Sequence, residues 1–191
     1  MNDIELVFLE FIYSLHTPAA DMFFTTVTRL GNYGIIWILS VVMLTAYKGT
    51  RLRGMTSAAA LAFDGIICYV IKIIIMRTRP FNVNTMIPLL ISAPTDYSFP
   101  SGHTGASFAV TAALFLTMSV PEDADSSPLI VRRPQIISAV SLILALLMAF
   151  SRLYLFVHYP TDVFAGIAIG ILCGYLGKAA ADAEIKRKNK E

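Results

Sequence analysis

The sequence predicts an all-α fold, a polytopic transmembrane helix bundle with five to six spans. Of the 191 residues, 56% are hydrophobic and only 15% are charged, and the mean hydropathy is +0.67. A soluble domain of this size is rarely so apolar. Long apolar runs recur along the chain, and several reach the roughly 17 to 25 residues that cross a hydrocarbon core. We therefore expect a single integral membrane domain over residues 1–191.

The first segment, residues 1–33, predicts an interfacial helix followed by a partly embedded one, which is the possible sixth span. Glu5 and Glu10 interrupt the apolar face of the first helix. Pro18 then ends this helix, because proline lacks a backbone donor and clashes with the preceding turn. The N-terminus is acidic where a secretory signal would be basic, so we expect no cleaved leader.

The transmembrane core is expected over residues 34–180. It contains one run that is short by itself and four that are long enough, or nearly so, to span a bilayer. These runs are residues 34–47, 55–76, 102–120, 135–153 and 163–180. In the last run, Gly166, Gly170 and Gly174 form a small-xxx-small stripe that allows another helix to approach closely. Residues 181–191 are expected to form a basic cytoplasmic tail.

The basic residues orient the bundle. They gather in three segments, which hold Lys48, Arg51 and Arg53, then Arg132 and Arg133, then Lys178, Lys186, Arg187, Lys188 and Lys190. By the positive-inside rule these segments are cytoplasmic, so the loops 77–101 and 154–162 face the other side together. The net charge of +2 is small and the basic residues are dispersed, which argues against nucleic acid as a partner.

Unusual polar residues gather in and beside these two loops. Lys72 and Arg79 are seven residues apart, within about 20° of each other on a helix, and Pro80 ends that helix at the surface. Arg77 and Arg79 are adequately interpreted as snorkelling interface anchors. Lys72 lies deeper and fits that interpretation less well.

A second cluster, FPSGHTG at residues 99–105, opens a helix whose first amide groups are unpaired. Such a terminus binds anions, and Ser101 is either a plain N-cap or a donor to a ligand. His103 favours the ligand, because a helix start needs no imidazole. In the third cluster, SRLYLFVHYPTD at 151–162, Asp162 lies four residues after His158 and is able to fix its tautomer and raise its basicity.

Together these clusters predict a receptor for a phosphoryl group. Lys72, Arg79 and Arg152 supply cations, and two histidines supply a nucleophile and a general acid. Asp96 and Asp162 are the only acidic residues in the two loops, and a two-metal phosphatase needs several carboxylate ligands. The residues therefore favour a metal-free site without a cofactor.

The order KxxxxxxRP at 72–80, PSGH at 100–103 and SRxxxxxHxxxD at 151–162 resembles the three-part signature of the type 2 phosphatidic acid phosphatase superfamily. The resemblance covers about half the chain and implies a role for each motif residue. His158 attacks phosphorus to give a phosphohistidine, Asp162 orients it, and His103 protonates the leaving oxygen. The phosphate-binding residues are Lys72, Arg79, Ser101, Gly102 and Arg152, and the family chemistry requires no metal.

Among family members, the chain most resembles small bacterial enzymes that dephosphorylate undecaprenyl diphosphate outside the cytoplasm. It carries Gly102 where they often have Asp, which leaves phosphatidylglycerophosphate and phosphatidate as alternative substrates. The resemblance thus implies a multi-pass protein of the cell membrane, with an extracytoplasmic site for a membrane lipid phosphate or diphosphate. A phosphotransferase and a non-enzymatic lipid-binding or transport protein are the rival classes.

Two further hypotheses concern residues outside the motifs. Asp64 lies inside the 55–76 run, where a carboxylate is expensive and usually paired, so we expect it to be an interhelical hydrogen-bond partner. The apolar stretch TMIPLLIS, residues 85–92, is expected to dip into the outer leaflet and contact the lipid tail through Ile87, Leu89 and Leu90.

Overall fold

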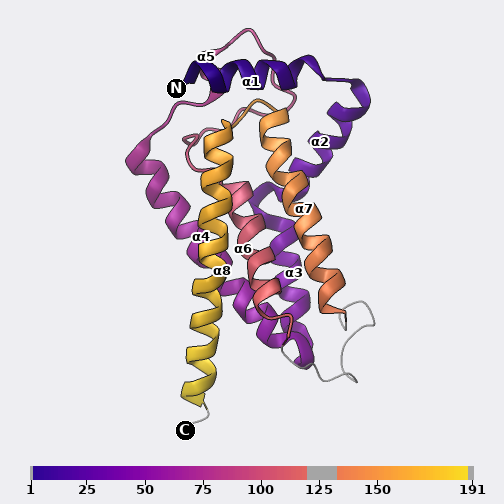
Figure 1. Cartoon of the computed structure of the whole chain (residues 1–191), viewed down its shortest axis with the longest axis vertical. Coiled ribbons are helices and arrows are strands. Elements are labelled where there is room, and N and C mark those ends of the chain that lie inside the picture. Colours follow the sequence, from indigo (N-terminus) through magenta and orange to yellow (C-terminus); the bar gives the residue numbers. More distant parts are fainter. Residues whose placement is uncertain (1, 120–132, 189–191) are drawn as a thin grey trace.

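The computed structural model describes residues 2–119 and 133–188, and within these ranges it is helical and has no strand. Figure 1 shows the arrangement of the helices in a bundle. The α-helices are α1 (Asn2–Ser14), α2 (Pro18–Gly31), α3 (Ile35–Ala46), α4 (Arg51–Ile75), α5 (Pro80–Val83), α6 (Gly102–Leu116), α7 (Pro134–Tyr154) and α8 (Pro160–Lys188). The predicted all-α class is confirmed.

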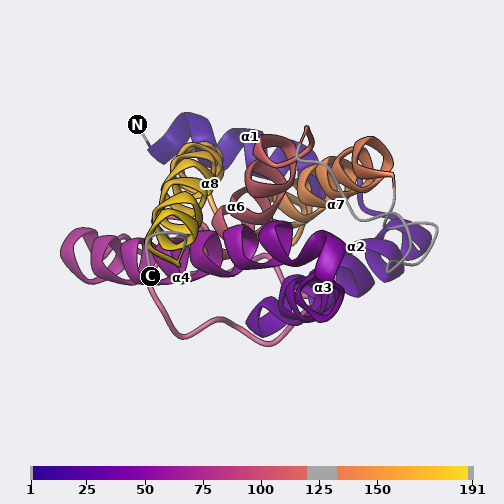
Figure 2. The same ribbon diagram turned by 90° about the horizontal axis from the view of Figure 1, so that it is seen from below.

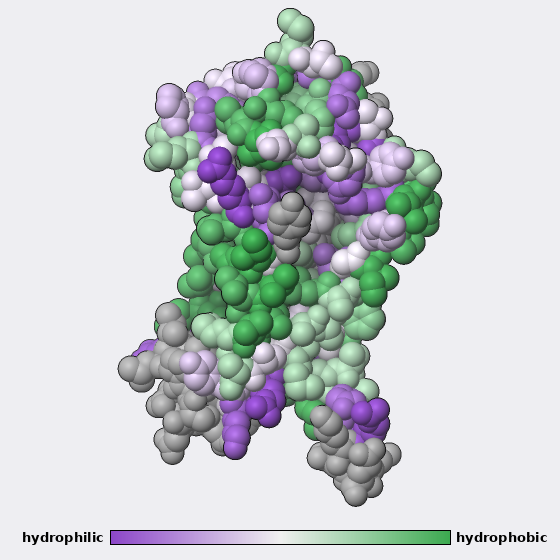
Figure 3. Space-filling view, turned by 180° about the vertical axis from the view of Figure 1, so that it is seen from behind, coloured by the Kyte–Doolittle hydropathy of each residue, from purple (hydrophilic) through white to green (hydrophobic). Residues whose placement is uncertain are grey.

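Three of these helices, α4, α7 and α8, are long and apolar enough to cross a membrane. The pair α2 and α3, bent by 51°, passes the same test as one broken span. On the face drawn in Figure 3, a belt of hydrophobic surface crosses the middle of the molecule, and hydrophilic residues gather toward its ends. This belt is what a bilayer core would cover, since lipid tails cannot hydrogen-bond exposed polar groups.

The short helix α6 lies among α4, α7 and α8 in both ribbon views (Figures 1 and 2). It ends at Leu116, earlier than the predicted run to residue 120, and residue 120 itself lies outside the described residues. Most of its side chains are buried in the bundle. Helix α8 is longer than predicted and continues to Lys188. Part of the segment expected to form a tail, residues 181–191, is therefore helical.

The glycine stripe of α8 packs directly on α6, as the spacing predicted. A Cβ atom at Gly170 would lie 2.4 Å from the carbonyl oxygen of Gly105, and one at Gly166 would lie 2.7 Å from that of Ser101. Side chains at these positions would therefore push the two helices apart. The close approach also joins the helix starts, because the Ser101 N–H donates to the Asp162 carbonyl at 3.0 Å.

Helix α1 lies across one end of the bundle instead of along it (Figure 1). Leu9 and Ile12 on its inner face are buried, whereas Ile4 and Phe11 on its outer face are exposed. Leu9 packs with Phe156 and Tyr159 from the loop between α7 and α8. The helix therefore covers the end of the bundle where the predicted site lies.

The same cluster involves two of the side chains in the hypothesis about residues 85–92. Ile87 and Leu89 are partly buried and pack against the cluster beneath α1, a contact that the sequence did not predict. Leu90 is exposed. The contact of these side chains with a lipid tail stays a prediction.

The two motif loops lie at the same end of the bundle as α1, as predicted (Figure 1). The connection between α3 and α4, which contains Lys48, lies at the opposite end together with the C-terminal part of α8, and Arg53 is in the first turn of α4. Arg132 and Lys190 from the predicted basic segments lie outside the described residues. The separation of basic segments from motif loops is the pattern that a transmembrane orientation requires.

Asp64 is buried in α4, but the hydrogen bond that the structure gives it is not between helices. Its Oδ1 accepts from the Cys68 thiol of the next turn at 3.4 Å. On the facing helix α6 lies Gly105, where a Cβ atom would come within 2.3 Å of this oxygen. The prediction of an interhelical hydrogen bond for Asp64 is therefore wrong, because the residue of α6 that faces it is a glycine, which has no side-chain donor.

The variant Gly170→Ala tests the packing of α8 on α6. We expect it to lower the free energy of unfolding by about 1 to 3 kcal/mol, because its methyl group would overpack a backbone contact. The measurement is the apparent Tm of the detergent-purified protein. Gly65→Ala is the matched control: nothing lies within 4 Å of a Cβ at Gly65, and its Tm should not fall. Equal Tm values for the two variants would contradict the packing argument.

Candidate active site

A cavity of about 660 Å³ opens at the end of the bundle that carries the motif loops. It is lined from α2, α4, α6, α7 and the loops that precede α6 and α8. Six of the eight predicted site residues reach its wall, namely Lys72, Arg79, Gly102, His103, Arg152 and His158. Ser101 and Asp162 are buried behind this wall. The bundle thus brings together residues that are up to 90 positions apart in the sequence.

The first motif supplies two cations to the cavity, Lys72 from the last turn of α4 and Arg79 from the loop that follows. The prediction that one helix carries both and ends at Pro80 is wrong, because α4 ends at Ile75 and Pro80 begins α5.

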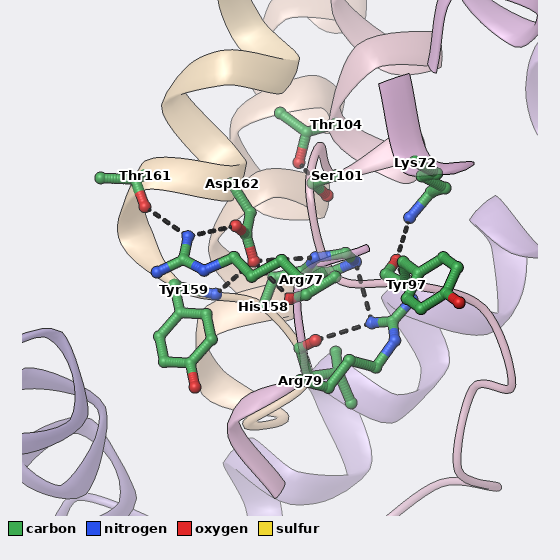
Figure 4. Close-up of polar contacts among 12 residues, drawn as sticks. Lys72, Arg77, Arg79, Tyr97, Ser101, Thr104, His158, Tyr159, Thr161 and Asp162 are labelled. Carbon is green, nitrogen blue, oxygen red and sulfur yellow. Dashed lines mark hydrogen bonds and ion pairs between the residues drawn. The ribbon is translucent and has the colours of Figure 1, made fainter. Parts of the chain in front are cut away.

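Arg79 is 4% exposed, and its guanidinium donates to the Val157 carbonyl at 2.7 Å and lies 3.2 Å from Nε2 of His158. The Lys72 ammonium donates to the Tyr97 carbonyl (Figure 4). Arg79 therefore lies against the histidine, and Lys72 lines the same cavity.

Asp96 covers both of these cations. Its carboxylate lies 3.1 Å from Nζ of Lys72 and 2.6 Å from a terminal nitrogen of Arg79. Burial raises the pKa of Asp96, but attraction to Lys72 and Arg79 outweighs it and lowers the pKa to about 2. Asp96 therefore stays ionised at neutral pH and occupies the position where the cations would meet an external anion.

The second motif places Ser101 at the start of α6, where its side chain makes no N-cap hydrogen bond. Its hydroxyl instead pairs with the Thr104 hydroxyl at 2.9 Å, and the residue is fully buried (Figure 4). At Gly102 a Cβ would meet nothing within 4 Å, so this helix start faces open space in the cavity. An N-terminus open in this way is suited to an anion.

His103, in the first turn of α6, faces the connection between α2 and α3. Its Nε2 lies 3.2 Å from the Asn32 side-chain oxygen, and both residues line the cavity. A Cβ at Gly31 would come within 3.1 Å of the imidazole. Asn32 and Gly31 were not singled out in the sequence, because no spacing rule links them to the motif.

His158 is 1% exposed in the loop between α7 and α8. Nε2 faces Arg79, and Nδ1 lies 3.5 Å from Oδ2 of Asp162, longer than an ordinary hydrogen bond. Burial, reinforced by the nearby Arg79 and Arg152, holds the pKa of His158 well below its usual range. The imidazole is therefore neutral at neutral pH, with a lone pair available to act as a nucleophile.

Arg152 at the end of α7 completes the cation set. It is 2% exposed, and its guanidinium donates to the hydroxyl of Thr28 on α2. Both residues line the cavity. Thr28 carries no sequence signal of its own, since a threonine in an apolar helix commonly bonds to its own backbone.

Asp162 is held on several sides. The Ser98 hydroxyl donates to Oδ2 at 2.5 Å, the Tyr159 N–H donates to the same oxygen at 2.9 Å, and Arg77 donates to Oδ1 at 2.5 Å (Figure 4). The snorkelling interpretation of Arg77 is therefore wrong. Its guanidinium lies 4.0 Å from the centre of the Tyr159 ring and also pairs with Glu5 of α1 at 2.6 Å.

This fold and site define a bundle of apolar helices with two histidines beside three buried or partly buried cations in a cavity at one end. The sequence profile described as "PAP2 superfamily" matches residues 53–185. The chain therefore belongs to the PAP2 superfamily, as its motifs predicted.

Similar proteins are phosphatases by name. The chain is 32% identical over 149 residues to an undecaprenyl-diphosphatase of Sulfolobus acidocaldarius, which covers 77% of this chain and 65% of that protein. It is 28% identical to the undecaprenyl-diphosphatase BcrC of Bacillus subtilis, over 85% of this chain and 76% of the other. The crystal structure of a PAP2 type phosphatidylglycerolphosphate phosphatase from Bacillus subtilis matches with a TM-score of 0.74 and 25% identity, over 97% and 88% of the two chains.

The variant Asp96→Asn should strengthen binding of inorganic phosphate by roughly three- to tenfold. The reason is that phosphate would no longer displace a carboxylate from Lys72 and Arg79, and an exposed ion pair contributes up to about 1 kcal/mol. Isothermal titration of the detergent-purified protein measures the change in Kd. Asp182→Asn removes a carboxylate paired with Lys178 on α8 and should leave Kd unchanged. Weaker phosphate binding in Asp96→Asn would show that Asp96 supports the anion site instead of competing for it.

Proposed function

We propose that this chain is a membrane lipid phosphatase that works through a phosphohistidine. The observation that carries the proposal is the convergence of His103 and His158 with three cations on one cavity. The family and the names of the similar proteins support it. A transport role does not explain why both histidines lie beside an anion site.

In the first step, Lys72, Arg79 and Arg152 hold the phosphate, with the Gly102 amide completing the set. Ser101, predicted to bind phosphate, lies behind the cavity wall and pairs with Thr104. The phosphate displaces the carboxylate of Asp96. Nε2 of His158 then attacks phosphorus, and the bond from phosphorus to the leaving oxygen breaks. The buried cations stabilise the charge that spreads over the phosphoryl oxygens in this transition state.

His103 donates a proton to the leaving oxygen in the same step. A bound phosphate next to this imidazole favours its protonated form, because an opposite charge nearby stabilises the cation. Water then attacks the phosphohistidine, His103 accepts a proton from that water, and the bond from phosphorus to Nε2 breaks. Inorganic phosphate leaves and His158 returns to its neutral form. No metal ion takes part in this scheme.

The proposed substrate is a polyprenyl diphosphate, with undecaprenyl diphosphate converted to undecaprenyl phosphate. Both undecaprenyl-diphosphatases among the similar proteins support this choice. Arg29 on α2 also lines the cavity, which adds a cation for the second phosphate of a diphosphate. Phosphatidylglycerophosphate is the second candidate, favoured by the structural match over nearly the whole chain.

We further propose that the protein lies in the cell membrane with this cavity on the extracytoplasmic side. The basic segments at the opposite end of the bundle support that orientation. At this level the cavity would meet lipid headgroups while the tails stay in the hydrocarbon.

The test is phosphate release by the detergent-purified protein in EDTA, with polyprenyl diphosphate, phosphatidylglycerophosphate and phosphatidate as substrates. We expect the native chain to prefer the diphosphate. His158→Ala should lower kcat by roughly three orders of magnitude or more, because it removes the nucleophile.

His16→Ala is the matched control. His16 stacks on Tyr154 at the turn between α1 and α2 and does not line the cavity, so most of the activity should remain. Activity that EDTA abolishes would contradict the metal-free mechanism. Transfer of the phosphoryl group to an added alcohol in preference to water would make the protein a phosphotransferase. No release from any lipid by the folded native protein would favour the binding or transport class.

A further inference from the structure

Glu5 is a buried carboxylate that the proposed mechanism does not use. It lies on the inner face of α1, one turn before Leu9, and is only 8% exposed. Placing a carboxylate there is costly unless it is paired and hydrogen-bonded. The hydrogen bonds and the ion pair that Glu5 makes offset the cost of burying its charge.

Both carboxylate oxygens of Glu5 accept hydrogen bonds. One contacts Thr161 in the first turn of α8, and the other contacts Arg77. Oε1 accepts from the Thr161 N–H at 3.0 Å and from the Thr161 hydroxyl at 2.7 Å, and Oε2 accepts from Arg77 at 2.6 Å. Burial raises the pKa of Glu5, but the hydrogen bonds from Thr161 and Arg77 outweigh it and hold the pKa below its ordinary value. Glu5 is therefore a carboxylate anion at neutral pH.

The contacts continue from Glu5 into the candidate active site. Arg77 bridges Glu5 and Asp162, at 2.6 Å and 2.5 Å, and Asp162 in turn lies 3.5 Å from Nδ1 of His158. The charged groups thus alternate along this path, from the Glu5 anion to the Arg77 cation, the Asp162 anion and the His158 imidazole. Arg77 and Asp162 are both largely buried, so solvent screens these charges only weakly.

We infer that Glu5 is a positioning residue for the nucleophilic histidine, acting through Arg77 and Asp162, so that α1 forms part of the active site. The inference rests on the proposed function, because it concerns the rate at which His158 reacts.

The physical reason lies in the charge that His158 acquires. When Nε2 bonds to phosphorus, the imidazole becomes cationic, and Asp162 stabilises that cation across Nδ1. Glu5 offsets the charge of Arg77. Without it, more of the Arg77 charge would act on Asp162 and weaken its attraction for the imidazolium. The loss would appear in the chemical step, since the contacts that the structure gives Glu5 are with Arg77 and Thr161 and not with the phosphate-binding cations.

The experiment compares Glu5→Gln with Glu10→Gln in the phosphate-release assay. Glu10 also joins α1 to the motif loop, accepting from the Asn84 amide at 2.7 Å, but it has no contact with Arg77. We expect Glu5→Gln to lower kcat roughly tenfold with KM unchanged. Glu10→Gln should stay within about twofold of the native kcat, as expected for a surface substitution.

A double-mutant cycle with Arg77→Gln separates positioning from folding. If Glu5 acts through Arg77, Glu5→Gln should have little further effect on kcat when Arg77 is already replaced. Additive losses in the double variant would overturn the inference, as would equal kcat values for the Glu5 and Glu10 variants. A lower kcat that is matched by a raised KM would also overturn it.

Folding is checked by the apparent Tm of each variant. Should Glu5→Gln fail to fold, Glu5→Asp keeps the charge but withdraws it by one methylene group, and it is compared with Glu10→Asp. A lower kcat for Glu5→Asp alone supports the inference, and equal kcat values overturn it. If the native chain releases no phosphate, the proposed function itself fails. An active native chain without a Glu5 effect rejects only the role of α1.

Discussion

The contact between α6 and α8 is the constraint on which the candidate site depends. Without side chains at Gly166 and Gly170, the two backbones approach closely, and the Ser101 N–H reaches the Asp162 carbonyl at 3.0 Å. This contact joins the start of the helix that carries PSGH to the start of the helix that follows His158. In a bilayer, where apolar helices gain little by leaving lipid, such close packing is a main source of association.

Several buried or partly buried cations lie together in the site, and the carboxylates paired with them determine which cations an external anion can reach. Asp96 lies on Lys72 and Arg79, which face the cavity, whereas Glu5 and Asp162 lie on Arg77 behind it. The exposed Asp96 is replaceable by a ligand with similar oxygens. The buried anions are not, because removing one partner of a buried pair leaves an uncompensated charge. In the proposed mechanism, Lys72 and Arg79 therefore bind phosphate while Arg77 supports His158 through Asp162.

Helix α1 connects the membrane surface to this arrangement. Its outer face exposes Ile4 and Phe11, which suits a helix that lies at the boundary between headgroups and hydrocarbon. Its inner face packs Leu9 on the loop that carries His158 and directs Glu5 to Arg77. Helix α1, which is too short to span a membrane, therefore covers the end of the bundle where the candidate site lies and contacts its buried charges.

The sequence by itself determined the helical class, the common side of the motif loops, and six of the residues that line the cavity. These follow from local rules, because apolar length predicts a span and charge asymmetry predicts its orientation. Only the tertiary structure decided what Arg77 and Glu5 contact, and that Asp64 faces Gly105 of α6 instead of a side-chain donor. A charged residue near a helix end has the same local signal whether it snorkels to water or pairs with a distant carboxylate. Its partner comes from another helix, 72 positions away for Arg77 and Glu5, and no periodicity encodes that encounter.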